Sequence, residues 1–171
     1  MNKHAKISFY LLRNMRFFSL ATKPHDLDSP WSASLLYIPK YDPLRLIWFS
    51  KLDARHSQAI SINPHVSGSM FLRQVNPISP PDINGAQFIG RARAIPYDEL
   101  QETYDDYYKQ VFPNEDTRKQ KALPISQFHG RGPRRFYELK VREWWLFDSE
   151  KQDDSRILVP LSELTHPPED Q

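Results

Sequence analysis

The sequence predicts a mainly β protein: a small antiparallel barrel of six strands with helices at its periphery. Three β-favouring runs follow one another across short turns between residues 16 and 49. This order indicates an antiparallel meander, because parallel strands would need long crossovers between them. The chain has 171 residues, of which 39% are hydrophobic and 13% aromatic. That composition supports one sizeable core, so we expect residues 1–171 to form a single domain.

The first half of the chain alternates short strands with two helices. Apolar residues at helical spacing predict a helix in the N-terminal segment 1–15, and Asn14 suits a left-handed stop. Aromatic and apolar runs bounded by turn residues then predict the strands. Their expected positions are 16–22, 31–38, 44–49 and 66–73, with a short helix before the last, stopped by Asn63-Pro64.

The second half begins with a strand expected over 86–95, in which Gly90 marks a bulge or a close approach. Pro96 then opens a helix, because Asp98 and Glu99 in its first turn suit the helix dipole. Tyrosines at helical spacing on this helix predict core packing rather than a binding site. Closing strands are expected at 136–141 and 144–147, a short edge at 156–160, and a frayed tail over 166–171.

The clearest functional signal is the segment that joins the third strand to the second helix. The strand ends at Ser50-Lys51, and we expect Asp53 to cap a helix whose first turn carries Arg55 and His56. A helix N-terminus presents free backbone N–H groups and the positive end of the helix dipole. With these side chains beside it, the corner is suited to hold a phosphate. The alternative is that the basic pair only faces water, since no glycine-rich fingerprint accompanies it.

Composition and spacing exclude several function classes. The formal net charge is only +2, and the basic segment 118–142 lacks interleaved aromatics, so we expect no nucleic-acid partner. The absence of cysteine excludes disulfides and thiol catalysis, and the six histidines lack the spacing of a metal-binding helix. No apolar run is long enough to span a bilayer and no signal peptide is visible, so we expect a cytoplasmic protein with no membrane partner.

Four segments in sequence order carry a resemblance to a known family. They are FFSLAT (17–22), PWSASLLY (30–37), LIWFSKLDARHSQAI with NPHVSGSMF (46–71), and AQFIGRARAI (86–95). Their order and spacing resemble the pyridoxamine 5′-phosphate oxidase-like, FMN-binding split-barrel superfamily over most of 17–148. The resemblance implies a six-stranded antiparallel split β-barrel of Greek-key type, with FMN as the cofactor.

The resemblance also implies which residues bind the flavin. The phosphate would be held after the third strand, at the corner already identified, and backbone groups of the second strand would line the isoalloxazine ring. A glutamine of the fifth strand would reach the flavin. Such barrels usually form homodimers with FMN between the protomers, so Trp144 or Trp145 would complete the site from the partner chain. The implied cofactor-binding set is Ala33, Ser34, Leu35, Phe49, Ser50, Lys51, Arg55, His56, Gln87 and Trp145.

The implied function is a flavin-dependent oxidoreductase that acts on a small-molecule substrate or electron donor, with FMN carrying the hydride. The oxidases themselves carry a late Arg-x-His pair that grips the pyridoxal-type substrate. Here that region reads DSEKQDDSRILVP, with Arg156 and no histidine, so we expect no efficient oxidation of pyridoxamine phosphate. Two alternatives stay open: a haem-binding or haem-degrading relative with His166 as an axial ligand, and a flavin-binding module without turnover.

Overall fold

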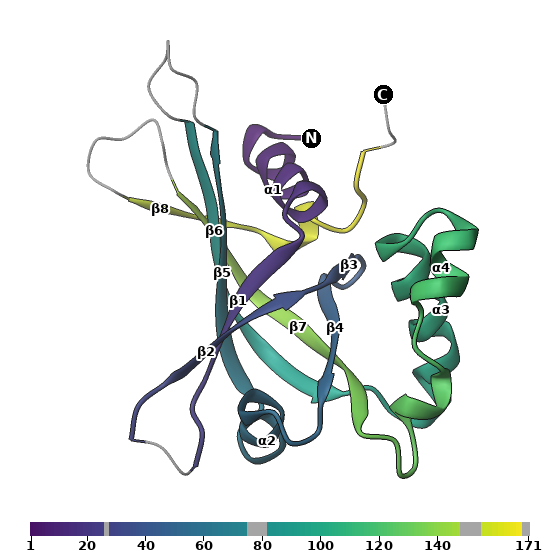
Figure 1. Ribbon diagram of the computed structural model, residues 1–171. Coiled ribbons are helices and arrows are strands. Elements are labelled where there is room, and N and C mark those ends of the chain that lie inside the picture. The colour runs from purple at the N-terminus through teal and green to yellow at the C-terminus, as the bar shows by residue number, and fades with distance from the viewer. Residues whose placement is uncertain (26–27, 75–81, 148–154, 169–171) are drawn as a thin grey trace.

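The computed structural model describes residues 1–25, 28–74, 82–147 and 155–168 and shows one antiparallel sheet of eight strands (Figure 1). The strands are β1 (Phe17–Thr22), β2 (Trp31–Leu36), β3 (Ile38–Lys40), β4 (Arg45–Lys51), β5 (His65–Gln74), β6 (Asp82–Ala94), β7 (Arg134–Phe147) and β8 (Arg156–Val159). Their order across the sheet is β2-β1-β5-β6-β7-β4-β3, and β8 pairs with β7. The prediction of a mainly β, antiparallel fold is confirmed, with eight strands in place of six.

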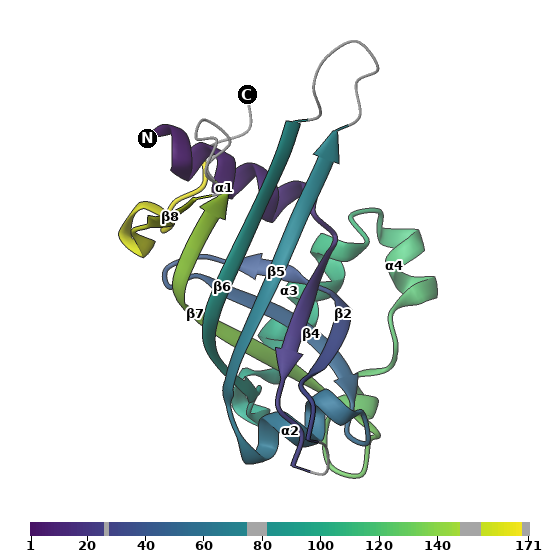
Figure 2. The same cartoon turned by 90° about the vertical axis from the view of Figure 1, so that its left-hand side faces the viewer.

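The sheet curls into a half-barrel because its two ends belong to one continuous stretch of chain. β2 and β3 stand at opposite ends of the strand order, yet only Tyr37 separates them. The Tyr37 N–H donates to the carbonyl oxygen of Arg16 at 3.3 Å, which holds this bend beside the start of β1. The prediction of a three-stranded meander is therefore wrong for its third strand, expected at 44–49. This strand is β4, and it pairs with β3 and β7, not with β2. Figure 2 shows β5 and β6 running along one side of the barrel beside β1.

Helices close the half-barrel at both ends and cover one side of it. They are α1 (Lys3–Asn14), α2 (Arg55–Ile62), α3 (Leu100–Val111) and α4 (Glu115–Lys121), with 3-10 turns at 97–99, 125–128 and 161–163. In Figure 1, α1 and α2 lie at opposite ends, and α3 and α4 form a layer beside β3 and β4. The sequence does not predict α4. Within the described ranges, no helix is long and apolar enough to cross a membrane.

Two helix ends differ from the prediction. Asn14 does not stop α1 in a left-handed conformation: it is the last helical residue, its side-chain amide donates to the Tyr10 carbonyl oxygen at 2.8 Å, and the chain leaves through an extended Met15. Asp53 does not cap α2, because the N-cap is Ala54 and no side chain accepts from the first turn. The residue that bounds the helix is extended and has no polar capping side chain in both places, Met15 after α1 and Ala54 before α2.

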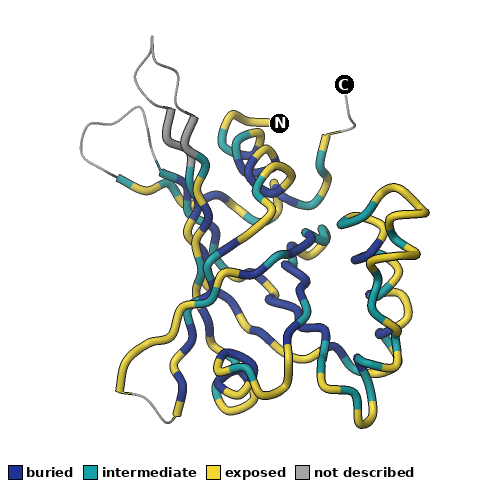
Figure 3. Tube along the Cα trace, viewed as in Figure 1, coloured by how far each residue is buried: buried dark blue, intermediate teal, exposed yellow. Residues whose placement is uncertain are grey.

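Two hydrophobic cores lie on the two faces of β4, so that this strand is buried on both sides (Figure 3). The larger core fills the half-barrel, where Phe9 of α1 joins Phe18, Trp48 and Trp144 of the sheet. The smaller core lies between the sheet and α3. Its fully buried members include Ile47, Leu100, Tyr107, Tyr108, Phe128 and Phe136. Two of them belong to the tyrosine stripe, so the prediction of core packing is confirmed.

Gly90 marks the point where β6 changes its register against β7. The pairing shifts between Ile89 and Gly90, as the sequence predicts. A Cβ atom at Gly90 would lie 2.3 Å from the carbonyl oxygen of Lys140, so the strands can approach here only without a side chain. The two strands expected at 136–141 and 144–147 are one continuous strand, β7, which passes beside this bulge.

Candidate functional site

The corner between β4 and α2 brings Ser50 and His56 into direct contact. Ser50 is the last residue but one of β4, His56 lies in the first turn of α2, and Ser50 Oγ is 2.7 Å from His56 Nε2. Both side chains are buried. Burial lowers the pKa of His56 below its ordinary value, so the ring is neutral near neutral pH. The pair therefore fastens the helix to the strand and adds no charge to the corner.

The exposed charge of the corner belongs to Arg55. Lys51, the last residue of β4, is also exposed, but strand alternation directs its side chain to the opposite face from Ser50. Within the described residues neither forms an ion pair. The Arg55 guanidinium lies 5.1 Å from the centre of the Trp31 ring, at the start of β2. The first turn of α2 has no side-chain cap, so its backbone N–H groups keep their capacity to donate to a ligand. This arrangement can attract and hold an anion.

Two further side chains, those of Arg135 and Tyr137, lie behind the corner, and the sequence alone does not place them there. The pairing of β4 with β7 sets Arg135 opposite Ser50, and its guanidinium donates to two backbone carbonyls of the loop 130–132, both at 2.8 Å. The Tyr137 hydroxyl faces Ser57 and Arg135, and burial is the main reason why its pKa is raised. Arg135 stands in a visibly basic segment, but only strand pairing shows which corner it supports.

Strand β2 presents backbone groups beside this corner. Among the described strands it pairs only with β1, so one row of its N–H and C=O groups has no partner in those strands. Ser34 is exposed and Ala33 is half-buried, whereas the Leu35 side chain belongs to the core of the half-barrel. Because the Tyr37 N–H is bonded to Arg16 and the pattern alternates along an antiparallel pair, a ligand along this edge would meet the main chain at Ser32, Ser34 and Leu36.

The side chain of Phe49 lies on the opposite face of β4 from the corner. Its ring packs against Tyr107, Phe128 and Phe136 at centroid distances of 5.4, 5.3 and 5.7 Å. Because side chains alternate along a strand, Ser50 points toward α2 while its neighbour points toward α3. Only the backbone of Phe49 is near the predicted phosphate residues.

Gln87 and Trp145 lie together on the outer face of the sheet, away from the corner. They stand directly opposite each other on β6 and β7 and line a groove of about 590 Å³ (the face of β5 and β6 in Figure 2). The register runs Ser34, Ser19, Ser69, Gln87, Trp145 across five strands. Gln87 is thus three strands from Ser34, roughly 14 Å at the usual strand spacing. A single chain does not bring this pair and the corner into one site.

The late part of the chain is only partly described. Trp144 is fully buried, and its indole N–H donates to Ser8 Oγ at 3.0 Å, so of the two candidate tryptophans only Trp145 reaches the outer face. The guanidinium of Arg156 lies 4.8 Å from the centre of the Phe147 ring. Residues 148–154, which carry most of the departure from the oxidase pattern, lie outside the described residues.

His166 is exposed, and its Nδ1 is 2.8 Å from Thr165 Oγ1. Of the tail predicted over 166–171, residues 169–171 lie outside the described residues. Among the side chains that the structure does describe, no three or more His, Asp or Glu form a group that could hold a metal ion.

The fold is similar to several solved structures, although no family model and no curated protein matches the sequence. A haem-binding protein of Mycobacterium smegmatis has a TM-score of 0.68 at 12% identity, over 96% of this chain and 61% of that one. A FAD-binding protein of Mesorhizobium loti has a TM-score of 0.59 at 16% identity, over 85% and 94%. A candidate pyridoxamine 5′-phosphate oxidase of Listeria innocua has a TM-score of 0.57 at 14% identity, over 86% and 100%.

These identities establish a shared fold only, and the chain spans less than two thirds of the length of the mycobacterial protein. The neighbours differ in the cofactor that their names give, haem for one and a flavin for another. What they share with this chain is the curled antiparallel sheet with its helices. The protein therefore has the split β-barrel fold of pyridoxamine 5′-phosphate oxidase-like proteins.

Proposed function

We propose that the protein binds FMN with the phosphate group at the β4–α2 corner. The observation that carries the proposal is the exposed guanidinium of Arg55 at a helix N-terminus that no side chain caps. A phosphate dianion fits this donor set, because backbone N–H groups and a guanidinium make charge-assisted hydrogen bonds to its oxygens. When bound, FMN supplies the hydride chemistry of a flavin-dependent oxidoreductase.

The flavin ring is proposed to lie along the free edge of β2. Arg55 contacts Trp31, the first residue of β2, so a phosphate held by Arg55 stands at one end of this edge. The ring would then run past the backbone of Ala33, Ser34 and Leu35. The similarity to a FAD-binding protein supports a flavin in this fold.

We further propose a homodimer in which the outer sheet faces of two copies meet. Within one chain Gln87 lies roughly 14 Å from Ser34 at the usual strand spacing, and Trp145 lies one strand farther away. A two-fold contact would bring the copies of this pair from the second chain toward the flavin. The same outer face carries small serine side chains and the exposed apolar residues Phe17 and Ile89, as a flat contact requires. Sedimentation velocity should show a dimer, and a monomer that binds FMN tightly would contradict the proposal.

The substrate is proposed to be a small molecule other than pyridoxamine phosphate. The sequence lacks the Arg-x-His pair of the oxidases, and Arg156, the arginine in that region, contacts the ring of Phe147. Steady oxidation of reduced nicotinamide by the FMN-loaded protein would support an oxidoreductase. Tight FMN binding without turnover of any donor would support the binding-module alternative.

The central experiment compares FMN with riboflavin, which lacks the phosphate, on wild type and on Arg55→Ala. We expect the variant to lose about tenfold to a hundredfold in FMN affinity, because a hydrogen bond to a charged group contributes about 1.5–3 kcal/mol. Riboflavin should bind both proteins equally. The control Lys109→Ala removes one positive charge from the exposed face of α3 and should change neither affinity. Equal losses for FMN and riboflavin would show that Arg55 supports structure and does not hold phosphate.

Haem is the second candidate, because the mycobacterial neighbour is a haem-binding protein. His166 is exposed and contacts Thr165 through Nδ1, which leaves Nε2 as the ring nitrogen for an axial bond. The absorption spectrum of the purified protein separates the candidates: flavin gives two broad bands in the near ultraviolet and blue, and haem gives a sharp Soret band. A Soret band that disappears in His166→Ala would favour haem over FMN.

A further inference from the structure

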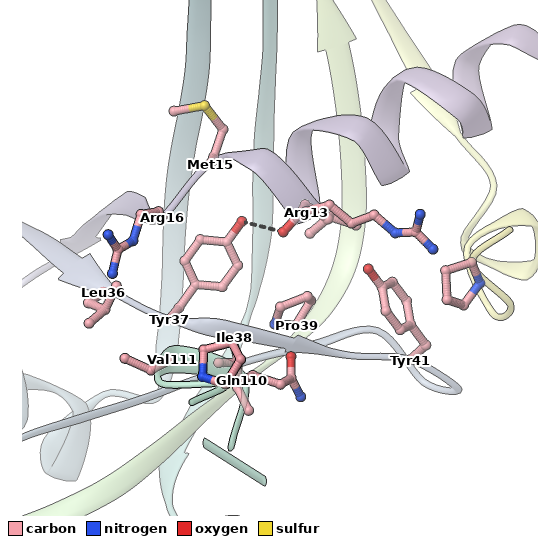
Figure 4. Close-up of a pocket in the computed structure, with 13 residues that line it drawn as sticks. Arg13, Met15, Arg16, Leu36, Tyr37, Ile38, Pro39, Tyr41, Gln110 and Val111 are labelled. Atoms are coloured by element: carbon pink, nitrogen blue, oxygen red, sulfur yellow. Dashed lines mark hydrogen bonds between the residues drawn. The ribbon is translucent and has the colours of Figure 1, made fainter. Parts of the chain in front are cut away.

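A cavity of about 630 Å³ opens at the α1 end of the half-barrel, between the last turn of α1, the β2–β3 bend and the end of α3 (Figure 4). Its volume lies within the range of small-molecule sites. The walls are largely apolar and include Leu12, Met15, Leu36, Ile38 and Val111. It shares no lining residue with the β4–α2 corner or with the outer-face groove.

Two of the polar groups at this cavity are already engaged in holding its walls. The Tyr37 hydroxyl donates to the carbonyl oxygen of Leu12 at 3.2 Å, the contact dashed in Figure 4. The Arg13 guanidinium donates to the carbonyl oxygen of Pro168, in the C-terminal segment that closes one side. Neither group is therefore the first choice for a ligand.

Arg16 differs from both. Its carbonyl oxygen accepts from the Tyr37 N–H at 3.3 Å, so its backbone is fixed at the rim of the cavity. Its guanidinium is exposed and has no hydrogen bond or ion pair to the described part of the chain. In Figure 4 the group lies beside Leu36, on the other side of Tyr37 from Arg13. No Asp or Glu lines the cavity to neutralise it.

We propose that this cavity binds a small amphipathic anion, an apolar chain that ends in a carboxylate. The chain would displace water from the apolar walls, which supplies most of the affinity. The carboxylate would pair with the planar guanidinium of Arg16, which suits two parallel hydrogen bonds. A neutral head group gains much less from Arg16, so the cavity selects for charge as well as for apolar length.

The test titrates the intact protein with octanoate and with octan-1-ol, which has the same chain and no charge. Amide chemical shifts of Leu36, Ile38 and Val111 should move saturably with both ligands, and octanoate should bind more tightly. Arg16→Gln should weaken octanoate binding about fivefold to tenfold and leave octan-1-ol within about twofold. Arg131→Gln removes another exposed guanidinium elsewhere and should change neither.

A second variant checks the cavity itself. Val111→Phe replaces a small side chain in the cavity wall by a larger aromatic one and should weaken the binding of both ligands. Its circular dichroism spectrum should match that of wild type, which would show that the fold is kept. The proposal is overturned if octanoate does not saturate in the millimolar range, if the shifts centre on another surface, or if Arg16→Gln and Arg131→Gln act alike. The riboflavin comparison at Arg55 reports on the other end of the barrel, so either proposal can fail while the other stands.

Discussion

The two faces of the β4–β7 strand pair differ in whether their charged side chains are paired. On the face toward α3, the buried carboxylate of Glu138 accepts from Arg45 at 3.1 Å and from Arg93 at 2.6 Å. Arg93 in turn reaches Glu99 at the start of α3. Every charge in this network has a partner, as a buried carboxylate requires.

On the face toward α2, the buried polar groups Ser50, His56 and Ser57 are uncharged, and Arg55 is exposed. Ser50 and His56 are bonded to each other, while Arg55 forms no ion pair within the described residues. The difference shows which arginines belong to the scaffold. A fully paired charge holds strands together, whereas an exposed cation without a counter-charge is available to a ligand.

The largest effect that tests this comparison should come from Glu138→Ala. Removing the carboxylate leaves two guanidinium groups without their shared partner, and we expect a loss of about 3 kcal/mol in the free energy of unfolding. We place it at the lower end of the range for a broken buried pair, because Arg93 is half exposed and can be rehydrated. Urea denaturation measures the change.

The matched control is Glu102→Ala, which removes a carboxylate from the surface pair with Lys40. The Glu102 side chain is 80% exposed, so the change should stay below about 1 kcal/mol. If the two variants lose the same stability, Glu138 is an ordinary surface charge and the contrast between the two faces fails.

The smaller effect concerns pH and the neutral pair at the corner. The pKa of His56 is lowered by burial in the folded protein, whereas in the unfolded chain it stays near its ordinary value of about 6.5. Between these two pKa values the unfolded state binds more protons, so stability is complete above about pH 7 and falls as the solution is acidified. Urea denaturation across this range should show the decline in wild type.

His56→Gln should flatten this decline, because glutamine can still bond to Ser50 but does not titrate. His65→Gln is the control: this histidine is exposed beside Arg91, and the decline should persist in that variant. A difference in stability between wild type and His56→Gln that does not vary with pH would contradict this prediction. It would mean that His56 has the same pKa in the folded and unfolded states, so that burial does not keep the Ser50–His56 pair neutral.

The sequence shows most of the elements because their signals are local. Alternating apolar and polar residues define β1 and β6, a helical stripe of tyrosines defines the buried face of α3, and Gly90 marks the bulge. The strand-to-helix corner is visible for the same reason, since Ser50 and His56 are near neighbours in the chain. Its cap was not determined locally: Asp53 suits an N-cap by residue type, yet the turn places Ala54 there.

The sequence by itself thus determined the fold class, the order of most strands and helices, and the contact between the end of β4 and the first turn of α2. Only the tertiary structure decided that the bend at Tyr37 sends β3 and β4 to the far end of the sheet, and that β7 places Arg135 and Tyr137 behind the corner. It also decided that Gln87 and Trp145 share a face remote from that corner. The physical reason is that pairing between distant strands follows from how the whole sheet buries both cores, whereas propensity and periodicity report only on neighbouring residues.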